Sequence, residues 1–345
     1  MKLFKLAAYI LIVFFKTGNL LSENYLFNVD NIILEKKDNI SINRLAPKAM
    51  DQAFTKLMSR ILLKEDMLKI SSLNSLNTKE LVSYYNITKN ENKKKNEVNF
   101  SITFDREKIH ELFFKEGISY SIIKEKEFYI LPILISEDNI FIFSNNYYYE
   151  SWNQITKDNQ IEFILPLENI ETIQNINRFR GNLSSLELNS LFKEYPNNNV
   201  ALILISDIKN SEKKIYLKSR VHEKTITKNL NLKNNKLDKK NFNKKTIFEI
   251  KELVTDLVKS QNLIDVRTPS FINVKYDLSK GNLVLIKSKL GKINLIEGIF
   301  VQHFNKDYVS LKVKYLGKID RIVNELKKEG MLLKFNNEEW VIKNL

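Results

Sequence analysis

Side chains that commonly carry chemistry are few in this chain and far apart. The 345 residues include three histidines and no cysteine, which excludes disulfide frameworks, thiolate zinc sites and thiol nucleophiles. None of the histidines, His110, His222 and His303, has a second histidine three or four residues away. The eight glycines never cluster, which excludes the phosphate cradles of dinucleotide-binding and P-loop proteins. We therefore expect no bound cofactor or metal.

One short segment places acidic groups and an imidazole on a single helical turn. Asp105 and Glu107 precede His110, and a carboxylate beside an imidazole is the pattern of a general acid–base pair. Asp105 also fits the N-cap of a helix that ends at Gly117 in a left-handed conformation. The sequence favours the capping role.

An aromatic cluster and an arginine pair are the best candidates for a binding surface. Consecutive tyrosines cannot all face one core, and exposed rings can stack on sugars or on a partner's apolar side chains. Two arginines around a phenylalanine can hold a carboxylate or phosphate group, although surface ion pairing explains them as well. The candidate partner-binding residues are Tyr147, Tyr148, Tyr149, Trp152, Arg178 and Arg180.

The formal net charge of +14 raises the question of a nucleic-acid partner, because basic surfaces release counterions from phosphates. Lysine supplies most of this charge and arginine is scarce. Bidentate recognition of phosphate favours arginine. Nucleic acid is therefore disfavoured as a partner, and peripheral contact with an acidic membrane or glycan surface is favoured over it.

The N-terminus has the pattern of an export signal. Lys2 and Lys5 precede the apolar run LAAYILIVFF at residues 6–15, which is shorter than the roughly 20 apolar residues of a membrane span. We expect cleavage after Ser22 and a periplasmic location, with an uncleaved inner-membrane tether as the alternative. The alternative interpretation of this apolar run is an N-terminal helix that is buried in the fold. No later segment is apolar for long enough to span a membrane.

The mature chain alternates helical and strand patterns, which predicts an α+β protein of three domains. An N-terminal α+β domain over 23–137 contains a helix from Ser41 to Leu63, a hairpin of strands at 84–88 and 98–104, and the apolar strand FYILPILI at 128–135. A middle α+β domain over 138–270 contains the most apolar strand, VALILISDI at 200–208, which we expect at the centre of a sheet. The first two domains are expected to be α/β sandwiches.

Two further segments complete the predicted organisation. Residues 222–245 are almost wholly Lys, Asn, Thr and Leu, which indicates a basic, mobile hairpin or loop. Residues 271–345 follow a β-α-β-β-α-β pattern, beginning with a strand at 283–286, which predicts a ferredoxin-like C-terminal domain.

The order of these blocks resembles a known family. The segments AMDQAFTKLMSRIL, VNFSITFDREKIHELFFKEGISY, NVALILISDI, EIKELVTDLVKSQ and VSLKVKYLGKIDRIVNELKKEGML are similar to domain-of-unknown-function family 2066, a family of exported Gram-negative proteins. The resemblance implies an envelope location and no established activity. It transfers no functional residue, because the matching segments are packing patterns.

Three functions are compatible with the sequence. The first is a non-catalytic periplasmic binding or assembly-accessory protein whose partner is an envelope protein or a cell-wall component. The second is an envelope hydrolase with a dispersed site, which would need His222 or His303 beside acidic residues in a deep pocket. The third is a basic protein that binds anionic lipid or nucleic acid.

Overall fold

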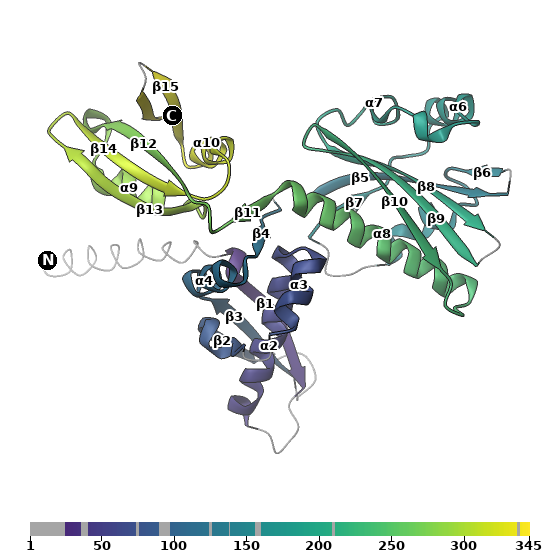
Figure 1. Cartoon of the computed structure of the whole chain (residues 1–345), viewed down its shortest axis with the longest axis horizontal. Coiled ribbons are helices and arrows are strands. Elements are labelled where there is room, and N and C mark those ends of the chain that lie inside the picture. The colour runs from purple at the N-terminus through teal and green to yellow at the C-terminus, as the bar shows by residue number, and fades with distance from the viewer. Residues whose placement is uncertain are drawn as a thin grey trace, which may run out of the picture. The chain divides into compact units, whose positions relative to one another are not determined.

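The computed structural model describes residues 25–35, 41–73, 76–89, 97–123, 126–137, 139–155, 160–208, 211–336 and 339–345. The predicted leader at 1–22 and the hairpin tip at 90–96 lie outside the described residues. The chain divides into two compact units (Figure 1). The outer unit combines Met1–Tyr120 with Leu263–Leu345, and the middle unit is Ser121–Asn262. The fold is α+β, as predicted.

The N-terminal part of the outer unit is a small antiparallel sheet covered by a helix. Its strands are β1 (Asn28–Glu35), β2 (Val82–Lys89) and β3 (Glu97–Phe104), in the order β1-β3-β2. Helix α2 (Ile42–Ile61) packs on the sheet through Ala49, Ala53 and Leu57, which recur every four residues and are fully buried. This apolar stripe produces the amphipathic helix that the sequence predicts. The short elements η2 (Tyr25–Phe27), α3 (Lys64–Ser71) and η3 (Thr78–Leu81) complete this part.

Helix α4 (Arg106–Glu116) begins and ends as the sequence predicts. The Asp105 carboxylate accepts hydrogen bonds from the backbone N–H groups of Glu107 and Lys108. Gly117 closes the helix at φ 66°, a conformation that favours glycine. The capping role of Asp105 is therefore confirmed. After α4, the strand β4 (Ser119–Ser121) pairs with β11 (Leu263–Asp265).

The middle unit is built on one large sheet. Strands β5 (Glu127–Ser136), β6 (Asn139–Phe141), β8 (Asn199–Ile208), β9 (Glu212–Val221) and β10 (Lys224–Lys233) lie in the order β10-β9-β8-β5-β6, and β7 (Glu162–Ile164) also pairs with β5. β8 is buried on both faces along most of its length, which fits its predicted central place. β5 pairs in parallel with β8 from residue 128 to residue 136. The predicted boundary at 137 is therefore wrong: β5 belongs to the middle sheet, and the first domain ends near Tyr120.

Pro132 lies in β5 at a position where one of the two neighbouring strands is missing. On the side of β5 away from β8, β7 pairs only with residues 127–129 and β6 only with residues 134–136. Proline lacks a backbone N–H and is tolerated at such a gap. The buried Asn146 amide donates to the backbone oxygens of Pro132, Phe141 and Ile142 at 2.8–3.0 Å, so a side chain fills this gap in the ladder.

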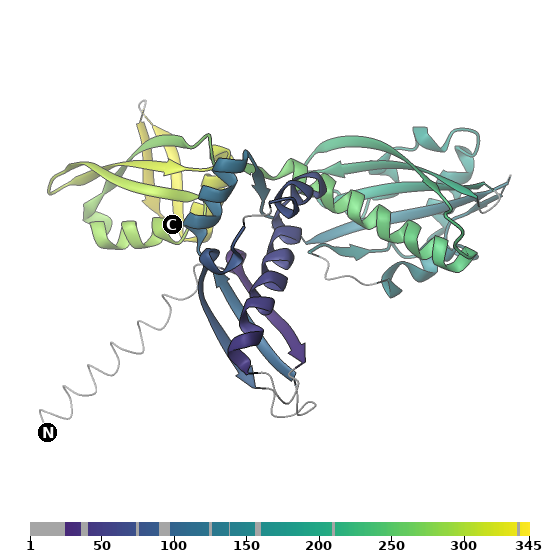
Figure 2. The same ribbon diagram turned by 60° about the horizontal axis from the view of Figure 1, so that its bottom comes forward.

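Helices cover both faces of the middle sheet. Helix α8 (Lys239–Gln261) runs along one face (Figure 2), where α5 (Tyr147–Ser151) and η4 (Trp152–Gln154) also contribute to the core. The other face is covered by α6 (Ile170–Arg178), η5 (Leu183–Ser185) and α7 (Leu188–Leu191). Between α6 and β8 the chain forms only two short helices, η5 and α7. Among the described residues, no helix combines the length and apolar character that a membrane crossing needs.

The predicted hairpin or loop at 222–245 contains the second strand of a hairpin, β10, followed by the start of helix α8. β10 pairs with β9 residue for residue from Lys224 to Lys233, and α8 begins at Lys239. His222 and Glu223 form the two-residue turn between the strands, both with positive φ (48° and 65°), as in a type I′ hairpin. The turn contains no glycine, so a local sequence pattern gives little sign of it.

The C-terminal part of the outer unit is a five-stranded sheet. It contains β12 (Ser270–Asp277), β13 (Ile296–Phe304), β14 (Tyr308–Tyr315), β15 (Met331–Asn336) and β16 (Glu339–Asn344), in the order β13-β14-β12-β16-β15. Its helical elements are η6 (Leu278–Lys280), α9 (Leu283–Gly291) and α10 (Ile319–Lys328). The predicted strand at 283–286 is wrong: Asn282 caps α9 there by accepting from the Leu285 N–H. A further strand, β16, runs parallel to β12.

Candidate binding groove

Strand register builds the floor of an open groove of about 1030 Å³ in the middle unit. One row across the sheet joins Ile140, Ile135, Ser206, Lys214 and Asn231, and the next joins Ile133, Leu204, Tyr216 and Asn229. Side chains alternate between the faces of a strand, so these rows point to the same face. The floor is therefore apolar over β5, β6 and Leu204 of β8, and polar at Ser206 of β8 and over β9 and β10.

The segment Arg180–Ser184, which follows α6 and includes the start of η5, forms the wall of this groove. Leu183 and Leu186 anchor the segment in the core. The Lys218 ammonium, on the groove face of β9, donates to the Leu186 carbonyl at 2.8 Å, and the Ser184 hydroxyl donates to the Asn182 side chain at 2.6 Å. The wall is thus fixed to the sheet by both apolar burial and hydrogen bonds.

The groove carries positive charge at two points and negative charge at one. Arg180 and Lys214 are exposed and line it, as does Glu137, which has φ 54°. Among the described residues Lys214 forms no ion pair, whereas the neighbouring cations Lys218 and Arg220 bond to backbone carbonyls of the covering segments. Amides, a phenol and an apolar floor beside two cations suit a polar ligand that carries a carboxylate.

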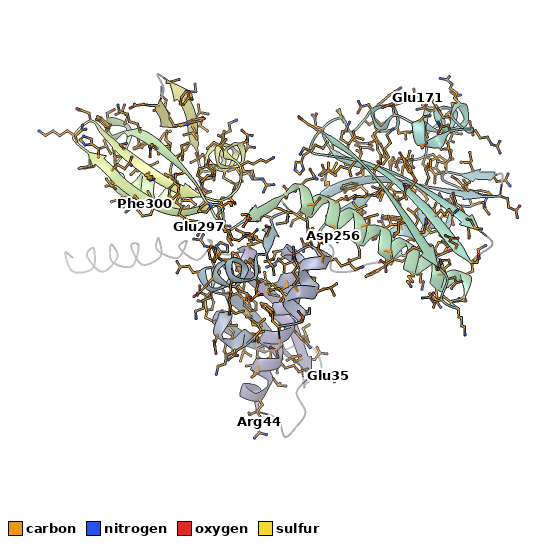
Figure 3. All side chains as sticks on the ribbon, viewed as in Figure 1. Glu35, Arg44, Glu171, Asp256, Glu297 and Phe300 are labelled. Carbon is orange, nitrogen blue, oxygen red and sulfur yellow. The ribbon has the colours of Figure 1, made fainter. Side chains whose placement is uncertain are left out.

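The two predicted arginines lie in different hollows. Arg180 lines the groove, but Arg178 lines a second hollow of about 800 Å³ beside α6 and α7. Glu171 and Lys193 form an ion pair at 3.4 Å in that second hollow; Glu171 is labelled in Figure 3. The sequence prediction of one arginine pair that grips a single anion therefore does not match the structure.

The predicted aromatic platform is largely internal. Trp152 and Tyr148 are 0% and 1% exposed and belong to the core on the α8 face. Tyr147 is half-buried against the same core. The half-buried Tyr149 donates from its hydroxyl to the Pro166 carbonyl at 2.7 Å. The prediction of an exposed stacking surface is wrong for Tyr148 and Trp152, because both rings are buried in the core that α8 helps to form.

Two lysines with lowered pKa values lie in the core, away from the groove. Burial lowers the pKa of Lys213, although Asp207 lies 2.9 Å from its ammonium and opposes the shift. Burial also lowers the pKa of Lys251 to about 8; its ammonium donates to the carbonyls of Trp152 and Ile155, each at 2.9 Å. Both ammonium groups also lie over aromatic rings, so each is enclosed by protein.

The outer unit contains an imidazole–carboxylate pair that sequence analysis missed. His110 Nδ1 lies 3.3 Å from Glu297 Oε1, and Arg106 lies 4.0 Å from the same oxygen. Burial would raise the pKa of Glu297, but His110, Arg106 and Lys314 together lower it. His110 is buried between the rings of Phe27 and Tyr120. The partner of His110 is thus a distant carboxylate and not Asp105, and the pair is shielded by aromatic side chains.

The other two histidines, His222 and His303, lie outside both hollows. His222 lies in the hairpin turn, where its N–H donates to the Asn199 side chain. His303 is exposed and contacts the Asn305 amide and the Tyr308 ring. Neither lines either hollow. In the described part of the chain, no group of three or more histidine or acidic side chains is placed to hold a metal ion.

Sequence analysis found only Arg180 among the groove residues. The missed side chains lie on β8, β9 and β10, namely Ser206, Lys214, Tyr216, Asn229 and Asn231. The signal that could have found them is the alternation of polar and apolar residues at 212–221, continued at 224–233. Interpreting 222–245 as a mobile hairpin or loop hides the second half of that signal.

Comparison with known proteins adds little to this geometry. No family model matches the chain, and no curated protein matches it. A solved structure titled "Crystal structure of uncharacterized protein" is similar over 40% of this chain and 99% of its own length, with 7% sequence identity and a TM-score of 0.16. A similarity at that score supports no conclusion about fold or function.

Proposed function

We propose that this protein is a non-catalytic binding or assembly-accessory protein of the cell envelope. The supporting observation is where the groups with shifted pKa values lie: Lys213 and Lys251, whose pKa values burial lowers, are enclosed in the core of the middle unit, and Glu297 lies in the outer unit. The groove itself is lined by amides, hydroxyls, two exposed cations and the exposed Glu137 carboxylate. Catalysis needs a tuned acid, base or nucleophile that touches the substrate. A surface without one is suited to binding.

The occupant that fits the groove is an acidic polypeptide segment of an envelope partner. Arg180 and Lys214 can pair with its carboxylates. Asn229 and Asn231 can both donate to and accept from its backbone amides, and Leu204 with its apolar neighbours on β5 and β6 can cover its aliphatic side chains. The alternative of an envelope hydrolase is not favoured by any arrangement around His222 or His303.

Export of this protein is part of the proposal. It is supported by the basic start and the short apolar run at residues 6–15, which are typical of a secretory signal. Membership of family 2066 stays a prediction from the resemblance. We also infer that the C-terminal sheet is a variant of the ferredoxin-like plan, because β12, α9, β13, β14, α10 and β15 follow its element order.

Site-specific photocrosslinking in intact cells tests the groove. A photoreactive residue at Tyr216, on the groove floor, should capture an envelope protein, and Lys214→Glu should reduce that product at least five-fold. The matched control places the crosslinker at Lys228 on β10, which pairs with Leu217 and therefore points to the opposite face. Equal products from both positions, or full-length chain with an intact leader in the cytosolic fraction, would contradict the proposal.

A further inference from the structure

The C-terminal sheet has one covered face and one open face. Along β12, Ile272, Val274 and Tyr276 are buried with the inner residues of α9 and α10. The alternate residue Phe271 is 52% exposed, and Phe300 on β13 is 53% exposed. Figure 3 labels Phe300 on this sheet. Two large rings are therefore left in solvent on the face opposite the helices.

Strand register defines what shares this open face. Its rows are Phe271 with Lys314 and Gly298; Asn273 with Lys312 and Phe300; Lys275 with Ser310 and His303; and Asp277 with Tyr308. Phe271 and Phe300 lie on either side of β14. The usual spacing of strands and residues puts their backbone positions about 10 to 12 Å apart. Lys312 and Lys314 lie between them. Ring faces and cations thus alternate across the sheet.

The rings and the lysines are in direct contact. The Lys312 ammonium lies 4.7 Å from the centre of the Phe271 ring, and the Lys275 ammonium lies 4.2 Å from that of Tyr308. The Phe300 ring lies over Gly298, where a Cβ atom would come within 3.0 Å of it. Glycine therefore lets this ring lie flat on the sheet with its outer face open, as a stacking surface requires.

The charge of this face is positive. β15 and β16 add Lys334 and Lys343 in the register of the same face. The lysines outnumber the carboxylates there, and Glu339 is already paired with Lys275 at 3.4 Å. All of these cations are lysines, which act as compact point charges and pair well with single carboxylates, whereas phosphate recognition favours the arginine fork. Charge complementarity therefore selects a carboxylate-bearing ligand.

We propose that this open face binds an acidic glycan. The C–H faces of two sugar rings of the glycan that are not neighbours in its sequence stack on Phe271 and Phe300, and carboxylates on the glycan pair with Lys312 and Lys314. Asn273 and Ser310 offer hydrogen bonds to hydroxyl and acetamido groups. The choice of a glycan over other anionic polymers rests on the proposed envelope location, and the contacts themselves are independent of the groove in the middle unit.

Calorimetric titration of the full-length chain tests this proposal. The probes are a tetrasaccharide of alternating N-acetylglucosamine and N-acetylmuramic acid, which carries carboxylates, and chitotetraose, which has none. We expect tighter binding of the acidic tetrasaccharide, with a difference that shrinks at high salt. Phe271→Ala and Phe300→Ala should each reduce the affinity for both glycans at least ten-fold. Lys312→Glu should reduce the affinity for the acidic tetrasaccharide selectively.

Matched controls use exposed residues on the helix side of the same sheet. Phe335 is 58% exposed and pairs with Trp340, in the register opposite to the open face, and Lys287 lies exposed on α9. Phe335→Ala and Lys287→Glu should change either affinity by less than two-fold. Equal loss in the controls, tighter binding of single-stranded oligothymidylate, or binding only to anionic vesicles would overturn the glycan proposal. Groove crosslinking that still depends on Lys214 would leave the proposed function standing in each case.

Discussion

Lys251 makes the stability of the middle unit depend on pH in a way that one substitution removes. Its ammonium is enclosed by the core, with 6% of the residue exposed, and its pKa is lowered from 10.5 to about 8 by burial. The unfolded chain keeps the ordinary value. Below about pH 8 both states are protonated, so the folded state bears the full desolvation penalty. As pH rises from 8 to 10.5, the folded state loses its proton first and stability increases.

The size of this effect follows from the two pKa values. A shift of one unit corresponds to about 1.4 kcal/mol, so the full penalty is about 3 kcal/mol, and about 2.5 kcal/mol of it disappears between about pH 7 and about pH 10. Lys251→Met removes the titrating group and also the bonds to the Trp152 and Ile155 carbonyls. The loss of those bonds changes stability at every pH, so the pH dependence of the difference isolates the ammonium.

Denaturant unfolding in a Trp340→Phe background provides the assay, because Trp152 in the core then reports the middle unit. The free energy of unfolding of the chain with Lys251, minus that of Lys251→Met, should rise by about 2.5 kcal/mol over this pH range. Lys244→Met, at an exposed position of the same helix, is the control and should give a flat difference. An equally flat difference for Lys251→Met would refute a buried, destabilising ammonium.

Three further changes test other parts of the fold. Asn146→Ala leaves the Pro132 carbonyl and two others without their donor, so urea denaturation should show a loss of about 2 to 4 kcal/mol. Glu223→Gly relieves a left-handed residue at φ 65° and should stabilise the hairpin by about 1 kcal/mol; a lower urea midpoint would contradict this. Glu297 has a lowered pKa beside His110, so its stabilisation is present above its unfolded pKa and is lost as acid titrates the folded carboxylate. The stability difference between the natural chain and Glu297→Gln should therefore shrink below about pH 4, and a difference that persists there would contradict the ion pair.

Local structure was predictable wherever the cause is local. The cap at Asp105, the left-handed Gly117 and the four-residue stripe of α2 each depend on neighbours within a few turns, so the sequence contains the whole explanation. The buried character of β8 was also predictable, because a continuous apolar run has to be covered on both faces. These features established an α+β fold and several of its elements.

The sites were not predictable, because they depend on which strands pair. Lys214 and Asn231 line the same groove as Arg180 only because the strands lie in the order β10-β9-β8, and a hairpin turn without glycine at His222 and Glu223 hides that order in the sequence. His110 meets Glu297 only in the tertiary fold, where aromatic rings enclose the pair and lower its contact with water. Composition determined how much positive charge the chain carries. Folding decided which cations are buried in cores, which hold loops, and which face solvent beside open rings, because only long-range packing sets the solvent exposure of a side chain.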